Sequence, residues 1–239
     1  MSFYLIQSGS GSKLETTFTP SIDLGPGKFE IALHSLETFY SIANIDAKNN
    51  KLKVSLDKET SWNTLILPIG CYEHSDICDE IQRQIMTLGG DKNSVVITAN
   101  RNTFQSVMLI KSEQVVVDFK IDNSINAVLG FEAKIFKKGR HVSKNTVNIM
   151  SINSILLHTD IINSAYLNGN QAPVVYSFWP DTAPGNKIVV QPRVLIYIPL
   201  SISVISRMTS WLSGQTQEQL DLRGETLTIK YHIRKCRTT

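Results

Sequence analysis

Hydrophobic and polar residues alternate with a period of two along most of the chain, as in half-buried β-strands. Turn-forming groups such as "GPG" (25–27) and "GGDKN" (89–93) separate these segments. In the first half, the pattern predicts strands at 29–36, 51–56, 64–69, 95–98, 106–110 and 115–119. In the second half, it predicts strands at 146–150, 154–161, 173–179, 187–191, 194–200, 202–212 and 225–235.

One stretch, "HSDICDEIQRQIMTLGG" (74–90), follows a helical period instead. Its apolar residues recur about one turn apart and so form one face. These residues are Ile77, Ile81, Ile85 and Leu88. Ser75 or Asp76 can cap the start of this helix, and Gly89–Gly90 can end it. One substantial helix is therefore predicted near 75–88.

The many strands with turns between them predict an all-β protein, a jelly roll or β-sandwich, with this one helix. The stretch "DNSINAVLGF" (122–131) predicts a short capped turn that ends at Gly130. The polar, basic segment 132–145 follows as a loop and is the best candidate for a domain boundary. We therefore expect an N-terminal β-rich region with the helix at 1–135 and a C-terminal jelly-roll-like region at 136–239. A single continuous domain is the alternative.

The composition narrows the class of protein. A chain of 239 residues with 42% hydrophobic residues can fill one large β core or two small ones. Its net charge of +3 gives no dense basic stripe, so nucleic-acid binding is not expected. The two basic clusters, at 134–141 and 233–239, are expected to be a solvated loop and a solvated end. The longest apolar run, Val194–Leu200, is too short to span a bilayer, and three cysteines fit a reducing compartment inside a cell.

No enzyme signature withstands inspection. The stretch "GSGSK" (9–13) lacks the spacing of a phosphate-binding loop and is interpreted as a flexible terminal segment. Cys71, His74 and Cys78 could offer three soft ligands to a metal, but a structural zinc site normally uses four. These three residues are weak metal candidates, and Cys78 fits equally well as a packed small residue. We predict no catalytic residue, no cofactor and no enzymatic activity.

Aromatic residues mark the candidate interface. The stretch "VVYSFWPDTAPGNK" (174–187) places Tyr176, Phe178 and Trp179 on an apolar strand that Pro180 ends, and Trp211 lies on a later strand. Large aromatic side chains dominate the energetics of protein–protein interfaces. The alternative, that they belong to the sandwich core, is equally weighted for Phe178 and favoured for Tyr176.

The second half carries a resemblance to a known family. The motifs are a Tyr-x-Asn-Gly turn at 166–169, "YSFWP" (176–180) before the turn at 184–185, "KIV" (187–189), "LIYIP" (195–199) and "DLRGE" (221–225). In the first half, "LPIGCYEHSDICDEI" (67–81) and "NSINAVLGF" (123–131) belong to the same set. With these motifs the chain resembles capsid-associated proteins of Polinton (Maverick) elements and the related adintoviruses, which are virus-like DNA transposons.

This resemblance implies a jelly-roll virion component, the minor (penton-type) protein at the five-fold vertices, which forms a homo-oligomer, most simply a pentamer, beside the major capsid protein. A double jelly-roll major capsid protein would be about twice as long. The stretch "QTQEQLDL" (215–222) replaces a more acidic turn expected in the family. A receptor- or carbohydrate-binding β module, of the fibre or lectin kind, and a subunit related to the major capsid protein are the alternatives. The resemblance also implies localisation to the virion, made and assembled in the host cell.

Overall fold

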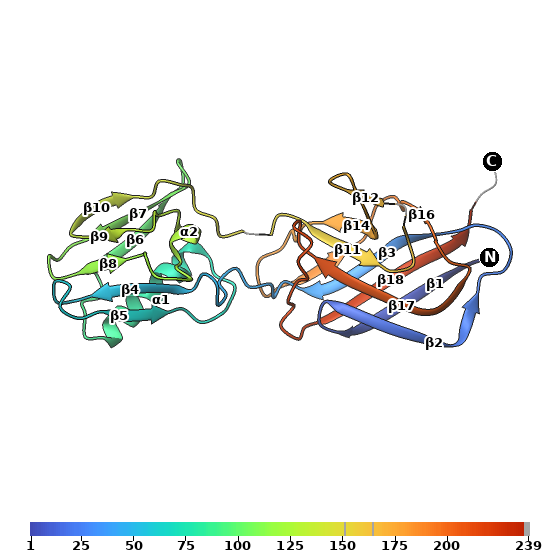
Figure 1. The fold of residues 1–239 in the computed structure, drawn as a ribbon, viewed down its shortest axis with the longest axis horizontal. Helices are drawn as coiled ribbons and strands as arrows, with labels where there is room; N and C mark the ends of the chain where they lie inside the picture. Colours follow the sequence, from blue (N-terminus) through green and yellow to red (C-terminus); the bar gives the residue numbers. More distant parts are fainter. Residues whose placement is uncertain (151, 164, 237–239) are drawn as a thin grey trace. The chain divides into compact units, whose positions relative to one another are not determined.

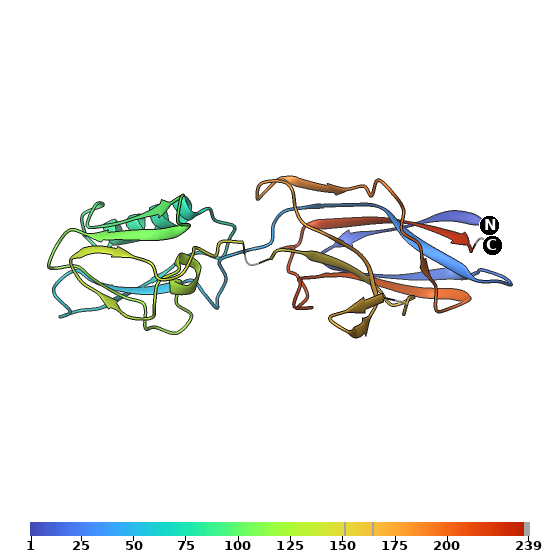
Figure 2. The ribbon, with the colours of Figure 1, turned by 90° about the horizontal axis from the view of Figure 1, so that it is seen from above.

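The computed structural model describes residues 1–150, 152–163 and 165–236. It divides the chain into two compact units (Figures 1 and 2). Unit 1 comprises residues 1–42 and 152–239, and unit 2 comprises residues 43–151. Unit 2 is thus inserted into the sequence of unit 1.

Unit 1 contains eight main strands in two antiparallel sheets. The first sheet has the order β1 (Ser2–Ser10), β18 (Thr226–Lys235), β3 (Phe29–Phe39) and β15 (Lys187–Val190), with β16 (Ile198–Pro199) also paired to β3. The second sheet has the order β14 (Val174–Phe178), β11 (Ile155–Thr159), β17 (Val204–Ser213) and β2 (Lys13–Asp23). A short hairpin of β12 (Ala165–Leu167) and β13 (Asn170–Ala172) accompanies them.

The pairing of these eight strands is nested. The first pairs with the last (β1 with β18), the second with the seventh (β2 with β17), and the third with the sixth (β3 with β15). The two innermost strands, β11 and β14, pair with each other. A long antiparallel ribbon of this kind, rolled into two facing sheets, is a jelly roll. The predicted fold class is confirmed.

The core of unit 1 follows from the alternation of its strands. In β18, Leu227, Ile229, Tyr231 and Ile233 are all fully buried, and the residues between them face outward. This face of β18 packs with apolar residues of both sheets into one cluster. Because side chains on a strand alternate between its two faces, the alternation of apolar and polar residues in β18 predicts which of its residues enter this core.

The described residues of unit 2 form two small antiparallel sheets and two helices. One sheet has the order β5 (Asn63–Ile66), β4 (Lys51–Ser55), β8 (Val116–Asp118) and β9 (Ile135–Phe136). The other has the order β10 (Gly139–Val142), β7 (Gln105–Ile110) and β6 (Val95–Asn100). The helices are α1 (His74–Thr87) and α2 (Asn126–Leu129), and unit 2 has an apolar core of its own.

Helix α1 is the predicted helix. Ile77, Ile81 and Ile85 are buried as the period indicated, whereas Leu88 is the exposed C-cap. The N-cap is Glu73 rather than Ser75 or Asp76. Asp76 takes part from the third helical position, where its carboxylate accepts a hydrogen bond from the Glu73 N–H at 2.9 Å.

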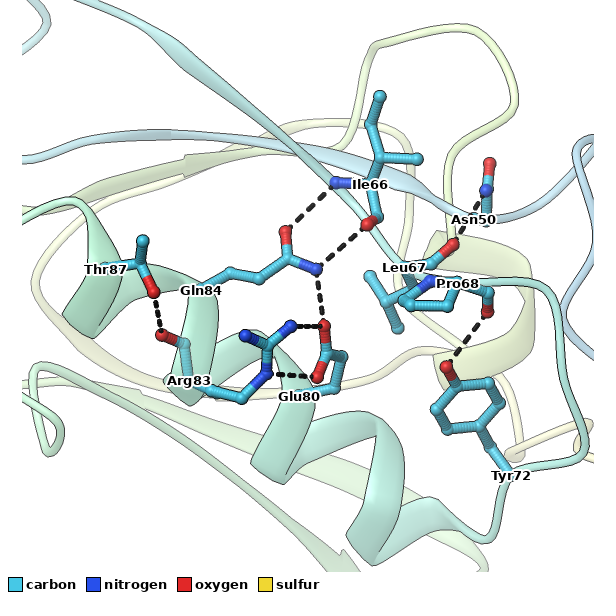
Figure 3. A network of polar contacts seen from close by, with 9 residues as sticks. All are labelled: Asn50, Ile66, Leu67, Pro68, Tyr72, Glu80, Arg83, Gln84 and Thr87. Carbon is cyan, nitrogen blue, oxygen red and sulfur yellow. Dashed lines mark hydrogen bonds and ion pairs between the residues drawn. The ribbon is translucent and has the colours of Figure 1, made fainter.

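The outer side of α1 protects the edge of a sheet (Figure 3). The Gln84 side chain accepts a hydrogen bond from the Ile66 N–H at 3.1 Å and donates one to the Ile66 carbonyl at 2.9 Å. Glu80 accepts a hydrogen bond from Gln84 at 2.7 Å and binds both Nε and Nη2 of Arg83. Strand β5 is an edge strand, and an amide paired in this way occupies backbone groups that another strand could use.

Several predicted elements differ from the structure. The segment 9–13 is not a flexible end, because Gly11 (φ 85°) forms the turn between β1 and β2. Residues 146–150 form no strand; the Asn148 N–H binds the Val128 carbonyl instead. Of the strand predicted at 194–200, only β16 forms, because β15 already pairs with β3 and the intervening residues loop out.

The structure also divides the chain elsewhere than at residues 135 and 136. These two residues form β9, which pairs with β8, and β10 pairs with β7, so segment 132–145 belongs to the sheets of unit 2. The short helix before it ends at Gly130 as predicted. Gly130 has φ 79°, and a side chain there would collide with the Asn145 carbonyl, so glycine is required.

Candidate functional site

Trp179 lies at the open side of the jelly roll. It follows β14 directly and its side chain is 71% exposed, which is unusual for tryptophan. A hollow of about 240 Å³ lies beside it, lined by residues 176–179, 181 and 188–191. Strands β14 and β15, which line the hollow, are edge strands of the two different sheets. The predicted interface residue Trp179 is thus accessible to a partner.

The two neighbouring aromatic residues are less accessible. Phe178 is only 6% exposed, pairs with Ile155 on β11 and belongs to the core of unit 1. Tyr176 is half-buried and packs against the same core. The core interpretation therefore describes Phe178, and Tyr176 offers part of its side chain to the hollow.

Trp211 occupies a different part of the second sheet. It pairs across the strands with His158, and the two rings stack with centroids 5.0 Å apart and an angle of 3° between their planes. His158 Nε2 lies 2.8 Å from the Ser213 hydroxyl oxygen, and burial lowers the pKa of His158. Trp211 is half-buried and serves the packing of unit 1 while leaving part of its ring exposed.

A third aromatic surface was not predicted. On the outer face of the first sheet, the Tyr4 ring packs against His34 and His232 at centroid distances of 4.9 and 5.1 Å. The Lys230 ammonium lies 4.1 Å from the centre of the Tyr4 ring. Tyr4 and Ile6 are both more than half exposed. The sequence does indicate this surface through the run "FYLI" (3–6). Four consecutive apolar residues place apolar side chains on both faces of a strand, so one face lies outside the core.

His232 connects this surface to the loop before β16. Its Nδ1 lies 2.6 Å from the Tyr197 hydroxyl, and its Nε2 lies 2.6 Å from the Ser2 hydroxyl. The Arg234 guanidinium stacks 3.4 Å from the Tyr197 ring centre and binds Glu30 at 2.6 Å. Burial, and then the charge of Arg234, lower the pKa of His232. These contacts hold the exposed aromatic rings in fixed orientations.

The weak metal candidates come together only in part. His74 is the first residue of α1, and its Nδ1 lies 3.6 Å from the Sγ of Cys78, one helical turn later. Burial raises the pKa of Cys78 to about 12, so this residue carries a thiol, whereas a metal binds the thiolate. Within the described ranges, no three His, Cys, Asp or Glu side chains gather as metal ligands would.

The basic segment 134–141 is largely neutralised by ion pairs. Lys137 binds Glu59 at 2.5 Å, Lys138 binds Glu113 at 3.1 Å, and Lys134 binds Glu132 at 3.0 Å. Of the second basic cluster, residues 237–239 lie outside the described part.

No helix in the part of the chain that the structure describes is both long and apolar enough to cross a membrane.

Neither a protein-family model nor a curated protein matches this chain. The fold is similar to that in a crystal structure of the mavirus penton protein, with a TM-score of 0.52 and 9% sequence identity. The match covers 99% of this chain and 100% of that chain. At this identity the likeness concerns the fold. The chain therefore shares its fold with that crystal structure.

Proposed function

We propose that this protein is a structural virion protein, the minor (penton-type) capsid subunit of a Polinton-like virus, which forms oligomers at the vertices. The observation that carries the proposal is the nested eight-strand jelly roll, whose likeness to the mavirus penton protein extends over the whole of both chains. The motifs that resemble Polinton and adintovirus proteins support the same role. They occur in both units, at 67–81 and 123–131 and again at 166–225.

The exposed aromatic residues of unit 1 support self-association. Trp179 at the open side of the roll and Tyr4 on the first sheet both expose apolar surface. Burying such surface against another chain lowers the free energy, so exposed apolar patches often mark interaction sites. A subunit in a closed ring can bury such surface against its neighbours. We expect a cyclic homo-oligomer, most simply a pentamer, that contacts the major capsid protein of the same virion.

Electron microscopy and sedimentation of the purified full-length protein test this role. A ring with five-fold symmetry is expected, and Trp179→Ala should weaken it without loss of fold, because the side chain contributes little to the core. The matched control is Ile69→Ala in unit 2, which removes an apolar side chain that is 50% exposed. A protein that stays monomeric, both alone and with the major capsid protein, would contradict the proposal.

The second candidate is a receptor- or carbohydrate-binding module. The observation in its favour is that unit 2 forms a separate compact body with its own core, inserted between β3 and β11. A glycan array with the full-length protein distinguishes the two: specific glycan binding by a protein that never forms rings would favour the module. We predict no enzymatic activity. Tightly bound metal at Cys71, His74 or Cys78 would point to an enzyme instead.

A further inference from the structure

Unit 2 contains a hollow of about 580 Å³ beside the turn that joins β6 to β7. One wall comes from residues 99–101 and Phe104 of this hairpin, and the other from residues 147–150; His74 of α1 also lines the hollow. Apolar atoms form most of the lining. Sites for small organic ligands commonly have volumes of about 300–1,000 Å³, lined mainly by apolar groups with a few polar ones.

Phe104, which lines this hollow, has an unfavourable backbone conformation. Its backbone has φ 56°, in the left-handed region that bulky residues avoid, and its side chain is 70% exposed. Its carbonyl accepts a hydrogen bond from the Val147 N–H at 2.7 Å, which joins the two walls. An exposed ring gains little from packing within the chain, so packing does not explain this conformation. Strained backbone of this kind concentrates at functional sites.

The second wall is fixed although it forms no strand. The Asn148 N–H donates to the Val128 carbonyl at 2.9 Å, and the Asn44 side chain donates to the Ile149 carbonyl at 3.0 Å. Met150, beside them, is 61% exposed. The hollow is therefore preformed, and a ligand would not have to order its walls on binding.

Arg101 gives the hollow a positively charged group, whereas His74 contributes a neutral one. His74 is neutral near pH 7, because burial lowers its pKa, and its ring nitrogens face the Ser106 hydroxyl at 2.9 Å and the Cys78 thiol at 3.6 Å. Arg101, which lines the hollow, is exposed, and its side chain makes no hydrogen bond or ion pair with any residue that the structure describes. Among the described residues, none of those that line the hollow is acidic.

We propose that this hollow binds a small amphipathic carboxylate. The apolar body of the ligand lies against Phe104, Ile149 and Met150, and its carboxylate pairs with the Arg101 guanidinium, which can hold both oxygens at once. This ligand site goes beyond the assembly role, because it lies in the inserted unit and uses none of the aromatic residues of unit 1.

Calorimetric titration of the full-length protein with decanoate tests the site, with decyltrimethylammonium as the probe of opposite charge. Decanoate should bind saturably, and the cationic probe should bind at least about tenfold more weakly. Arg101→Ala should weaken decanoate binding by a similar factor, whereas the control Arg140→Ala, which removes an exposed arginine elsewhere in unit 2, should not change it. Ala99→Phe should block the site, since Ala99 is exposed on β6, where an aromatic side chain is tolerated.

Three results would overturn the proposal: no saturable binding of decanoate, equal affinity for both probes, or unchanged binding by the Ala99→Phe and Arg101→Ala variants. Should Ala99→Phe fail to fold, the Arg101 and Arg140 variants decide alone. If Ala99→Phe folds and abolishes self-association, the hollow holds a neighbouring chain and not a small ligand. Ring formation is measured on the same samples, so failure of the ligand site is separable from failure of the capsid role.

Discussion

Polar side chains in the core of unit 1 join its two sheets. Tyr231 on β18 donates to the Ser210 hydroxyl oxygen at 2.8 Å, and Ser210 on β17 donates to Gln7 Oε1 at 2.6 Å. The Gln7 amide on β1 donates in turn to the Met208 carbonyl and the Thr16 hydroxyl, both at 3.0 Å. Burying a polar group costs free energy unless it is hydrogen-bonded, so these contacts offset the burial of the Tyr231, Ser210 and Gln7 side chains.

Tyr231→Phe should lower the free energy of unfolding of unit 1 by about 1 kcal/mol, because the Ser210 hydroxyl loses its donor while the ring still fills the core. The control is Tyr4→Phe, which removes a hydroxyl from an exposed ring and should change stability by less than about 0.5 kcal/mol. Urea unfolding monitored on unit 1 gives both values. Equal losses in the two variants would show that the buried network contributes nothing.

His158 makes the stability of unit 1 depend on pH. Burial lowers its pKa, so in acid the unfolded chain binds a proton at this residue before the folded chain does. The contribution is present in full above about pH 6.5, the value for an unfolded chain, and is lost as the pH falls toward the lower folded value. His158→Gln should therefore make the decrease of unfolding free energy below that pH less steep. Parallel pH profiles of the variant and the natural protein would refute this.

Alanine at Cys71, His74 or Cys78 should leave assembly intact and cost about 1 kcal/mol of packing at most sites. The raised pKa of Cys78 disfavours the thiolate that zinc needs. Metal analysis of the purified protein checks this expectation. Stoichiometric zinc that is lost in step with any of these three substitutions would reverse it.

At the scale of helices and strands, the regular spacing of apolar residues was the part of the sequence that best predicted the structure. Helix α1 and strand β18 were predicted nearly to their ends, because their apolar residues recur at a fixed interval over several turns or pleats. Strands β1 and β2 were missed, since "GSGSK" (9–13) has the composition of a flexible end. The burial of Gln7 in β1 depends on Ser210, a partner 203 positions away that no local pattern reveals.

Ile81→Pro should unfold unit 2. Proline inside a helix costs about 3 kcal/mol or more, and Ile81 is also a fully buried member of the core of this unit. Because unit 1 has a separate core, its unfolding transition should persist in the variant. Circular dichroism and limited proteolysis measure both effects, with Ile81→Val as the conservative control, which should cost about 0.5–1.5 kcal/mol. A variant in which unit 2 stays folded would show that α1 is dispensable.

At the scale of the whole molecule, the sequence predicts a jelly roll but not how the chain divides between the two units. Segment 132–145 has the composition of a linker, yet β9 and β10 within it complete the sheets of unit 2. The divisions lie near residues 42 and 151, where "YSIANID" (40–46) and "NIMSINS" (148–154) contain no glycine, proline or run of charge that would indicate a linker. Only the long-range pairing of β1 with β18 and of β2 with β17 reveals the insertion.

Assembly of the proposed ring should depend on apolar area more than on charge. The chain has a net charge of only +3, and Trp179 exposes a large apolar ring at the open side of the roll. Burying about 800 Å² per subunit face, at about 25 cal/mol per Å², gives enough gross stabilisation to offset the cost of association. Added salt screens charges but leaves apolar contacts, so high salt should not disperse the oligomer.

Sedimentation at low and high salt measures this, with Trp179→Ala and Trp211→Ala as the two probes. At least one variant should weaken assembly while unit 1 remains folded. The Trp179 variant is the cleaner probe, because Trp211 also stacks on His158 and its removal will cost stability. An oligomer that dissociates when salt is added would indicate an interface held by charge, and the ion pair between Lys187 on the edge strand β15 and Glu37 on β3 would then be the first place to look.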